Sequence, residues 1–222
     1  MINKTPVDSI IFDMDGTLWD AVDSYAVIWN VSLDQVGIEH EPVRREELLK
    51  HMGSYLDRIL EKLIPDVPKQ KELLQLVMKN EAEMMPELGG RLYPGVRETL
   101  AELVRHYRLF MVSNCGPQGL ENFVAYNGLQ GYFEDLLSHG GNGKSKTENI
   151  RLLIERYGLK SPVYVGDTQG DADSTHAADL PFIWTSYGFG KVDNAEAEVS
   201  RFDELPSAIN RINKEIEAQK KI

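Results

Sequence analysis

Two aspartates, Asp13 and Asp15, follow a short apolar segment and are themselves followed at once by Gly16 and Thr17. Residues 9–12 include two β-branched isoleucines and predict a short buried strand. Side chains at positions i and i+2 leave a strand on the same face, so both carboxylates are predicted to point into one site. Two close carboxylates repel each other unless a cation or a shared proton intervenes. The pair therefore indicates either a bound Mg²⁺ or two carboxyl groups whose pKa values differ. The alternative is a strand that ends in a solvated acidic turn.

A second pair of carboxylates, Asp167 and Asp171, follows another apolar segment at residues 163–165. Carboxylate oxygens suit Mg²⁺, which usually binds one or two carboxylates and keeps several waters. Asp167 leaves a predicted buried strand directly and is the stronger candidate ligand. Asp171 lies four residues later, where an acidic side chain can instead cap the start of the next helix.

Ser113 and Asn114 end a third apolar segment, at residues 109–112. A hydroxyl and an amide at this position can donate hydrogen bonds to phosphate oxygens without adding charge. Both residue types are also common in ordinary turns, and that alternative stays open. Cys115 follows directly but has no evident histidine partner nearby, so we interpret it as a small buried residue and not as a nucleophile.

Two lysines, Lys144 and Lys146, precede a segment with helical spacing at residues 147–157. An ammonium group binds phosphate as a point charge, and a nearby helix N-terminus adds to the positive potential. Most lysine pairs in loops are merely solvated, so the position of this pair along the chain carries more weight than its composition.

Strand and helix patterns alternate from residue 93 onward, which predicts an α/β fold with a Rossmann-like parallel sheet and helices on both faces. From residue 19 to about residue 86 the chain shows helical spacing and no convincing strand, with breaks near residues 37, 42 and 65–68. We therefore expect a catalytic core formed by residues 1–17 and 93–222. Residues 18–92 are expected to form an inserted, all-helical cap above the site that excludes water from it.

The 222-residue chain has a formal net charge of −11, which argues against nucleic acid and anionic membranes as partners. An anionic substrate would therefore need a metal or local positive charge. The single cysteine excludes an intrachain disulfide. No apolar stretch approaches the roughly 20 residues of a membrane span, and residues 1–8 lack the features of a signal peptide. These features predict a cytoplasmic protein and do not indicate its oligomeric state.

The motif Asp13-Met14-Asp15-Gly16-Thr17-Leu18 resembles the nucleophile loop of the haloacid dehalogenase superfamily of phosphotransferases. Three further elements follow in the order of that family, with the helical insert before the first of them: Ser113, then Lys144, then Asp167 with Asp171. Within the superfamily, the chain looks like the phosphoglycolate phosphatase-like and β-phosphoglucomutase-like branch. The segments that add to this likeness are Ser113-Asn114-Cys115, Val165-Gly166-Asp167-Thr168 and Ser186-Tyr187-Gly188-Phe189-Gly190.

The lysine element departs from the family pattern. The family often has Lys-Pro-x-Pro, whereas this chain has Lys144-Ser145-Lys146-Thr147. Alignment on the following Glu148 favours Lys144 as the phosphate-contacting lysine, with Lys146 as the alternative.

The resemblance implies a role for each candidate residue. Asp13 would be the nucleophile that forms an aspartyl-phosphate, and Asp15 would be the general acid and base. Mg²⁺ would be held by Asp13, the backbone carbonyl of Asp15 and Asp167, while Asp171 would orient ligands or waters. The residues expected to bind the phosphate are Gly16, Thr17, Ser113, Asn114 and Lys144.

The implied function is a Mg²⁺-dependent phosphatase that acts on a small phosphorylated metabolite. A sugar-phosphate mutase of the same branch would use the same residues and is the first alternative. A 2-haloacid dehalogenase or a phosphonate-cleaving enzyme is disfavoured, because those enzymes usually lack an aspartate at the position of Asp15. A non-catalytic binding module with a degenerate site belongs to a different class, but no expected catalytic residue is missing from this sequence.

Overall fold

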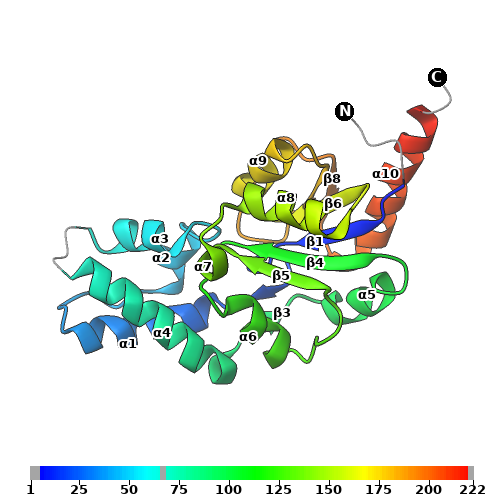
Figure 1. Cartoon of the computed structure of the whole chain (residues 1–222). Helices are drawn as coiled ribbons and strands as arrows, with labels where there is room; N and C mark the ends of the chain where they lie inside the picture. The colour runs from blue at the N-terminus through cyan, green and yellow to red at the C-terminus, as the bar shows by residue number, and fades with distance from the viewer. Residues whose placement is uncertain (1–5, 66–68, 220–222) are drawn as a thin grey trace.

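The main sheet of the molecule is parallel and has six strands in the order β5-β4-β1-β6-β7-β8 (Figure 1). The structure is a computed structural model that describes residues 6–65 and 69–219. Its α/β architecture confirms the predicted fold class. The strands of this sheet are β1 (Ser9–Phe12), β4 (Arg108–Ser113), β5 (Asp135–Ser138), β6 (Pro162–Gly166), β7 (Phe182–Thr185) and β8 (Ala197–Val199).

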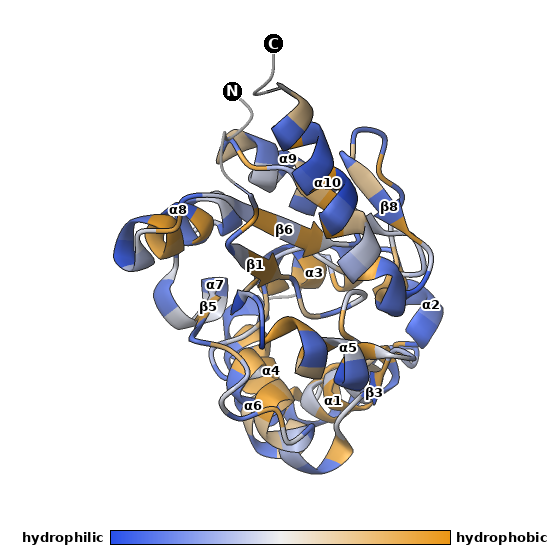
Figure 2. Cartoon of the chain, turned by 90° about the vertical axis from the view of Figure 1, so that its right-hand side faces the viewer, coloured by the Kyte–Doolittle hydropathy of each residue, from blue (hydrophilic) through white to orange (hydrophobic). Residues whose placement is uncertain are grey.

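Helices cover both faces of the sheet, as Figure 1 shows. Ile10 and Phe12 of β1 join a hydrophobic cluster with residues of α5, α6 and α10, whereas Ile11 joins a cluster with residues of α8 and α9. This alternation is the period of two that a strand imposes on its side chains. Figure 2 shows β1 and β6 as largely hydrophobic strands in the interior. The helical elements of this part are α5 (Val96–Leu103), α6 (Gly119–Tyr126), α7 (His139–Asn142), α8 (Lys146–Tyr157), α9 (Gln169–Ala177), the short 3₁₀ helix η1 (Phe202–Glu204) and α10 (Leu205–Gln219).

Four further helices lie to one side of the sheet and form a hydrophobic cluster of their own (Figure 1). Trp29 and Leu33 of one helix are buried in this cluster together with Leu73 and Val77 of another. The four helices are α1 (Val22–Val36), α2 (Arg45–Leu49), α3 (Leu56–Leu63) and α4 (Gln70–Leu88).

A two-stranded antiparallel ribbon, β2 (Trp19–Asp20) with β3 (Arg91–Leu92), flanks these helices. The expectation that residues 18–92 contain no strand is therefore wrong at both ends of that segment. Each strand has only two residues, too few for an alternating pattern to show in the sequence. The helix break predicted at residues 65–68 falls mostly on residues 66–68, which lie outside the described residues.

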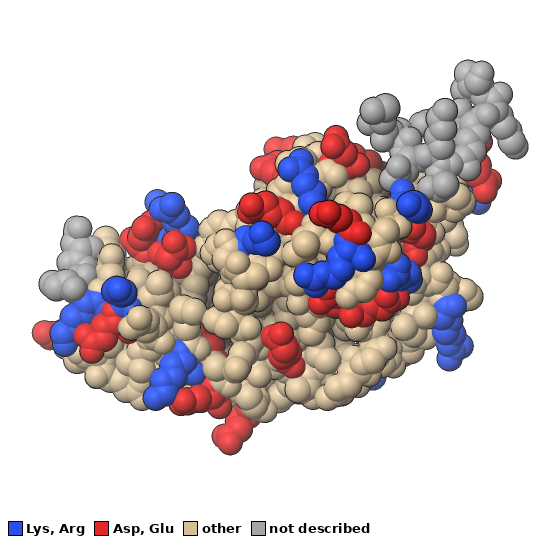
Figure 3. Space-filling view, in the orientation of Figure 1, with Lys and Arg blue, Asp and Glu red and all other residues tan. Residues whose placement is uncertain are grey.

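Two features bear on large polyanions and membranes as partners: the distribution of charge on the surface and the length and apolar character of the helices. On the face in Figure 3, Lys and Arg side chains are interspersed with Asp and Glu. Within residues 6–65 and 69–219, none of the helices combines the length and apolar character that crossing a membrane requires.

Three neighbouring strands, β4, β1 and β6, position the candidate residues. Because these strands are parallel, their carboxyl ends meet at one edge of the sheet, where ligands bind in open α/β folds. Ser113 ends β4, Asp13 follows β1 directly, and Asp167 follows β6 directly. The fold thus brings together side chains that lie up to 154 positions apart in the sequence (from Asp13 to Asp167).

Candidate active site

Asp13 is held by the backbone of the sheet at the end of β1. Its N–H donates to Val165 O on β6 at 2.9 Å. The side chain is only 5 % exposed, and its Oδ1 accepts a hydrogen bond from Lys146 Nζ at 2.7 Å. Burial raises the pKa of Asp13 and the neighbouring Asp171 carboxylate raises it further, while Lys146 acts in the opposite direction. A backbone hydrogen bond from Met14 also lowers the pKa of the Asp13 carboxyl group.

Asp15 accepts hydrogen bonds from two aromatic side chains on the helical side of the site. Trp19 Nε1 donates to Asp15 Oδ1 at 3.0 Å, and the Tyr25 hydroxyl lies 3.1 Å and 3.2 Å from the two carboxylate oxygens. Burial raises the pKa of Asp15 to about 7, and the negative charge of Asp13 contributes in the same direction. A carboxyl group with this pKa can both give and take a proton near neutral pH.

The turn after Asp15 requires glycine but uses its own amides internally. Gly16 has a φ of +82°, and a Cβ at this position would lie 2.1 Å from Asp167 Oδ2, so a larger residue does not fit. The N–H groups of Gly16 and Thr17 donate to Trp19 O at 2.9 Å and to Met14 O at 3.3 Å. Closing the tight turn thus engages both amides, whereas the buried Thr17 hydroxyl has no hydrogen-bond partner among the described residues, so phosphate binding by Gly16 and Thr17 stays a prediction.

Asp167 is the most enclosed carboxylate of the site. Its side chain is fully buried, and Oδ2 accepts a hydrogen bond from the Phe189 N–H at 2.7 Å. Among the described residues, no donor reaches the buried Oδ1. Burial raises the pKa of Asp167 well above its usual range, and Asp171 and Asp13 contribute to the same shift. One oxygen from each of these three aspartates lies within 4.8 Å of the others, an arrangement that could hold a cation.

Asp171 has both carboxylate oxygens occupied by the protein itself. Oδ2 accepts from the N–H and the hydroxyl of Thr168, at 2.9 Å and 2.8 Å, and from the Asp167 N–H at 3.2 Å. Oδ1 accepts from the Lys146 ammonium. Thr168 is the N-cap of α9 and Asp171 the third residue of that helix, so the two side chains form a capping box. With its oxygens engaged in this way, Asp171 is suited to orienting its neighbours.

Lys146 is the lysine that reaches the site. Its side chain is only 2 % exposed, and its ammonium group bonds to both Asp13 and Asp171. Burial alone would lower the pKa of Lys146, but the two carboxylates outweigh burial and raise it well above the ordinary value. Lys146 is therefore charged and completes a buried cluster of three aspartates and one lysine.

Lys144, which the alignment on Glu148 favoured, is exposed and lies before the helix. Lys146, the alternative that the sequence left open, is thus the lysine that lies beside Asp13. Ser145 caps α8, and Glu148 completes its capping box, so Lys146 is the first helical residue. The Ser-x-x-Glu spacing of Ser145 and Glu148 was the signal in the sequence that could have shown where the helix begins, and therefore which lysine is its first residue.

Ser113 and Asn114 line the cavity over the cluster but differ in their contacts. Ser113 Oγ accepts from the Cys115 N–H at 3.2 Å, which leaves its own proton free to donate. Asn114 Nδ2 donates to Gly53 O at 2.8 Å and so connects the end of β4 to the loop between α2 and α3. Burial raises the pKa of Cys115 above its ordinary value. The thiol therefore stays protonated, in agreement with its interpretation as a non-nucleophile.

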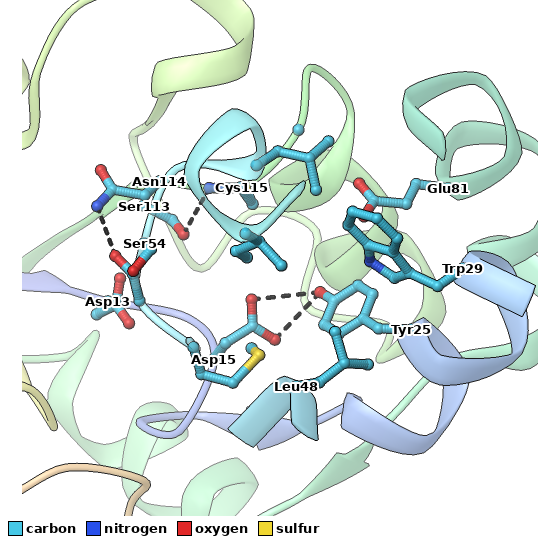
Figure 4. Close-up of a pocket in the computed structure, with 15 residues that line it drawn as sticks. Asp13, Asp15, Tyr25, Trp29, Leu48, Ser54, Glu81, Ser113, Asn114 and Cys115 are labelled. Atoms are coloured by element: carbon cyan, nitrogen blue, oxygen red, sulfur yellow. Dashed lines mark hydrogen bonds between the residues drawn. The ribbon is translucent and has the colours of Figure 1, made fainter. Parts of the chain in front are cut away.

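The cavity has a volume of about 50 Å³ and lies between the sheet edge and the helices α1–α4. Figure 4 shows Asp13, Ser113 and Asn114 on one side and Tyr25, Trp29 and Glu81 on the other. Sequence analysis missed Tyr25 and Glu81 as site residues. Tyr25 lies in an apolar helical pattern that indicates only packing, and Glu81 belongs to no motif.

Known proteins are similar to this chain in sequence. Residues 10–185 match the protein family described as haloacid dehalogenase-like hydrolase. Two curated phosphoglycolate phosphatases are similar to the chain. The protein from Synechococcus elongatus is 28 % identical over 187 residues, with 82 % of this chain and 85 % of that protein covered. The protein from Aquifex aeolicus is 25 % identical over 190 residues, with 83 % and 87 % covered.

Solved structures show the same fold. The chain superposes on a protein from Clostridium acetobutylicum, described as a predicted phosphatase, with a TM-score of 0.80 and 21 % identity, covering 93 % of this chain and 100 % of that one. A protein from Haemophilus somnus, described as a predicted phosphoglycolate phosphatase, gives a TM-score of 0.74 and 22 % identity, with 91 % and 98 % covered. The chain belongs to the haloacid dehalogenase-like hydrolase family. It is an enzyme of the hydrolase class, and the resemblance to this family is confirmed.

Proposed function

We propose that this protein is a Mg²⁺-dependent phosphatase that hydrolyses a small phosphomonoester through an aspartyl-phosphate on Asp13. The observation that carries the proposal is the buried cluster at the ends of β1 and β6, formed by Asp13, Asp167, Asp171 and Lys146. The names of the curated relatives support the same class of reaction.

The charge of the cluster supports a divalent cation. Three buried carboxylates face one ammonium group, and an incoming phosphate would add further negative charge. The buried Asp167 Oδ1 lacks a donor among the described residues, and a metal ion would satisfy this oxygen. Asp13, Asp167 and the backbone carbonyl of Asp15 would hold Mg²⁺. When bound, the ion would offset the repulsion between carboxylates and phosphate and stabilise charge on the transferring group.

The proposed reaction has two steps, the formation and then the hydrolysis of an acyl-phosphate on Asp13. Asp13 attacks phosphorus, which forms an acyl-phosphate and breaks the bond to the alcohol oxygen, while Asp15 gives its proton to that oxygen. Asp15 then takes a proton from a water that attacks the acyl-phosphate, and inorganic phosphate leaves with Asp13 regenerated. Tyr25 and Trp19 orient the Asp15 carboxyl group through their hydrogen bonds.

The remaining core residues position the reacting groups. Lys146 fixes Asp13 Oδ1 and contributes positive charge beside the phosphate. Asp171 holds the Lys146 ammonium in place, and the Ser113 hydroxyl donates to a non-bridging phosphate oxygen.

Residues 18–92 act in this proposal as a cap over the core. Asn114 Nδ2 bonds to Gly53 O, and a Cβ at Gly53 would lie 3.1 Å from Thr168 Cγ2, so the α2–α3 loop contacts two loops of the core. The cavity thus lies between the catalytic residues of the core and the helices of the proposed cap, so residues of the cap contact the leaving group.

Release of inorganic phosphate from a panel of two- to six-carbon phosphomonoesters and from p-nitrophenyl phosphate tests the proposal. We expect turnover with Mg²⁺, loss of turnover with EDTA and recovery when Mg²⁺ is added back. Absence of turnover for every ester with Mg²⁺ present would overturn the assignment. Product analysis with hexose 1-phosphates separates a phosphatase from a mutase, because a mutase returns the 6-phosphate and no free hexose.

A further inference from the structure

Glu81 extends from α4 into the cavity on the side away from Asp13. Figure 4 shows its carboxyl group beside Trp29 and Tyr25, facing the space above Asp15. Its Oε2 also approaches the backbone after β4, because a Cβ at Gly116 would lie 2.8 Å from this oxygen. Glu81 thus lies where the helices of the proposed cap meet the core, at the end of the cavity that the leaving alcohol would occupy.

The Glu81 carboxyl group has no partner in the part of the chain that the structure describes, neither a hydrogen bond nor an ion pair. The nearby Tyr25 hydroxyl donates to Asp15 instead. Much of the surrounding wall is apolar and consists of Trp29, Leu48, Met52, Leu56 and Ile59. Glu81 is half-buried, so a ligand that covers its carboxyl group has to supply a hydrogen-bond donor in place of the water it displaces.

No cation lies beside Glu81 to receive an anionic ligand. The described residues that line the cavity include no Lys, Arg or His. The same holds for the described lining of a smaller cavity of about 10 Å³ on the other side of Glu81. Lys146, the cation of the core, is bonded to Asp13 and Asp171. Burial and the nearby Asp15 carboxylate together raise the pKa of Glu81 to about 8, so Glu81 carries its negative charge above that pH.

We propose that Glu81 is a specificity-determining residue that selects a leaving group with a hydrogen-bond donor, a hydroxyl or an ammonium, and rejects one with a carboxylate. This inference rests on the proposed phosphatase function and narrows its substrate class to small polyol or amino-alcohol phosphates. It separates the chain from relatives named for phosphoglycolate, whose leaving alcohol carries a carboxylate. Above about pH 8, where Glu81 is ionised, a carboxylate placed against it would be a like-charge contact without a compensating cation.

Three phosphomonoesters of matched size test the inference with the full chain and Mg²⁺ at pH 8.5, where Glu81 is ionised. They are 2-phosphoglycolate, 2-hydroxyethyl phosphate and O-phosphoethanolamine, which differ only in the group at the second carbon. We expect kcat/KM for at least one of the latter two to exceed that for 2-phosphoglycolate by roughly tenfold or more. The better of these two identifies the donor as a hydroxyl or an ammonium. A chain that hydrolyses 2-phosphoglycolate as well as or better than both would overturn the inference but leave the proposed phosphatase function standing.

At pH 8.5 the variant Glu81→Gln removes the negative charge and keeps the shape of the side chain. We expect the preference over 2-phosphoglycolate to fall roughly tenfold, and turnover of p-nitrophenyl phosphate, measured in parallel, reports any general loss of activity. Glu87→Gln is the matched control, because Glu87 is exposed on the same helix. An unchanged preference in Glu81→Gln would overturn the role of Glu81. If the wild-type chain hydrolyses none of the esters, including p-nitrophenyl phosphate, the proposed function fails and the inference falls with it.

Discussion

The ammonium group of Lys146 lies 2.7 Å from Asp13 Oδ1, although 133 positions separate the two residues in the chain. The same ammonium also bonds to Asp171, and all three side chains are buried. A buried charge that loses its partner costs far more than a surface charge, because no water replaces the contact. The cluster therefore links the first strand, α8 and α9 by charge, in addition to the hydrophobic packing around them.

Lys146→Ala is expected to lower both stability and activity. It leaves Asp13 and Asp171 buried without their cation, which should cost about 3–5 kcal/mol of the free energy of unfolding. Phosphatase activity should fall with it, because Asp13 loses the group that orients it. Chemical denaturation and kcat/KM measure the two effects. Lys144→Ala is the control and should stay near wild type, since Lys144 is exposed; the opposite ranking of the two variants would contradict the register seen here.

Asp167→Asn and Asp171→Asn should separate a metal ligand from an orienting residue. Asp167→Asn removes a buried carboxylate whose oxygen lacks a donor among the described residues, so the metal-free protein should gain stability on the order of 1 kcal/mol. The same variant should lose most of the stabilisation that Mg²⁺ gives to the wild type. Asp171→Asn should instead destabilise the metal-free protein, because it weakens the contact with Lys146.

Thermal unfolding with EDTA measures the stability of the metal-free protein for each variant. Thermal unfolding with increasing Mg²⁺ measures how much the ion stabilises it. Activity as a function of Mg²⁺ concentration gives the corresponding metal affinities. An equal loss of Mg²⁺ affinity in the two variants would count against Asp167 as the direct ligand.

The fold was predictable because its patterns are local. The apolar run of β1, with Asp13 directly after it, specifies a buried strand and its functional end without reference to the rest of the chain. The parallel sheet follows from the alternation of such strands with helices. The short β2 and β3 were missed because two residues hold no pattern.

The contacts within the site were less predictable, because they depend on packing between distant segments. Tyr25 and Glu81 approach Asp15 only when α1 and α4 are placed against the core. A helical pattern reports which face of α1 is apolar, but it does not report that a hydroxyl on that face bonds to a carboxylate. The sequence also did not show that the turn itself takes up the amides of Gly16 and Thr17 and leaves the Thr17 hydroxyl without a partner among the described residues.

Glu81 should make the stability of the metal-free protein depend on pH. Burial raises its pKa from 4.5 to about 8, so between these values the folded chain keeps a proton that the unfolded chain has released. The folded state then binds more protons, and its stability falls as the pH rises from about 4.5 to about 8.

Glu81→Gln removes this contribution, so the variant should gain stability relative to wild type across that range. The gain should reach about 1–3 kcal/mol at pH 8.5, below what the full pKa shift implies because the side chain is partly exposed. Denaturation in EDTA at pH 5 and pH 8.5 measures the difference, with Glu87→Gln as the control. A difference between wild type and Glu81→Gln that is the same at both pH values would contradict the raised pKa.

Asp13→Asn and Asp15→Asn should fail at different steps of the proposed reaction. Asp13→Asn replaces the nucleophile by an amide, so no acyl-phosphate forms and no alcohol is released. Asp15→Asn keeps the nucleophile and retains an oxygen that can accept from Trp19 or Tyr25. With an aryl phosphate, whose leaving group scarcely needs a proton, Asp15→Asn should still transfer the phosphoryl group to Asp13. Hydrolysis of the acyl-phosphate should then slow by about 10²–10⁴-fold, because the general base is gone.

Rapid-quench measurement of aryl alcohol distinguishes the two variants. Asp15→Asn should release about one equivalent of alcohol in a burst and then turn over slowly, whereas Asp13→Asn should show no burst. With ³²P-labelled substrate, Asp15→Asn should also carry the label on Asp13 after the burst. The acyl-phosphate is the only species in the proposed reaction that holds phosphate on the protein. A burst from Asp13→Asn, or label on any other residue, would therefore overturn the assignment of Asp13 as the nucleophile.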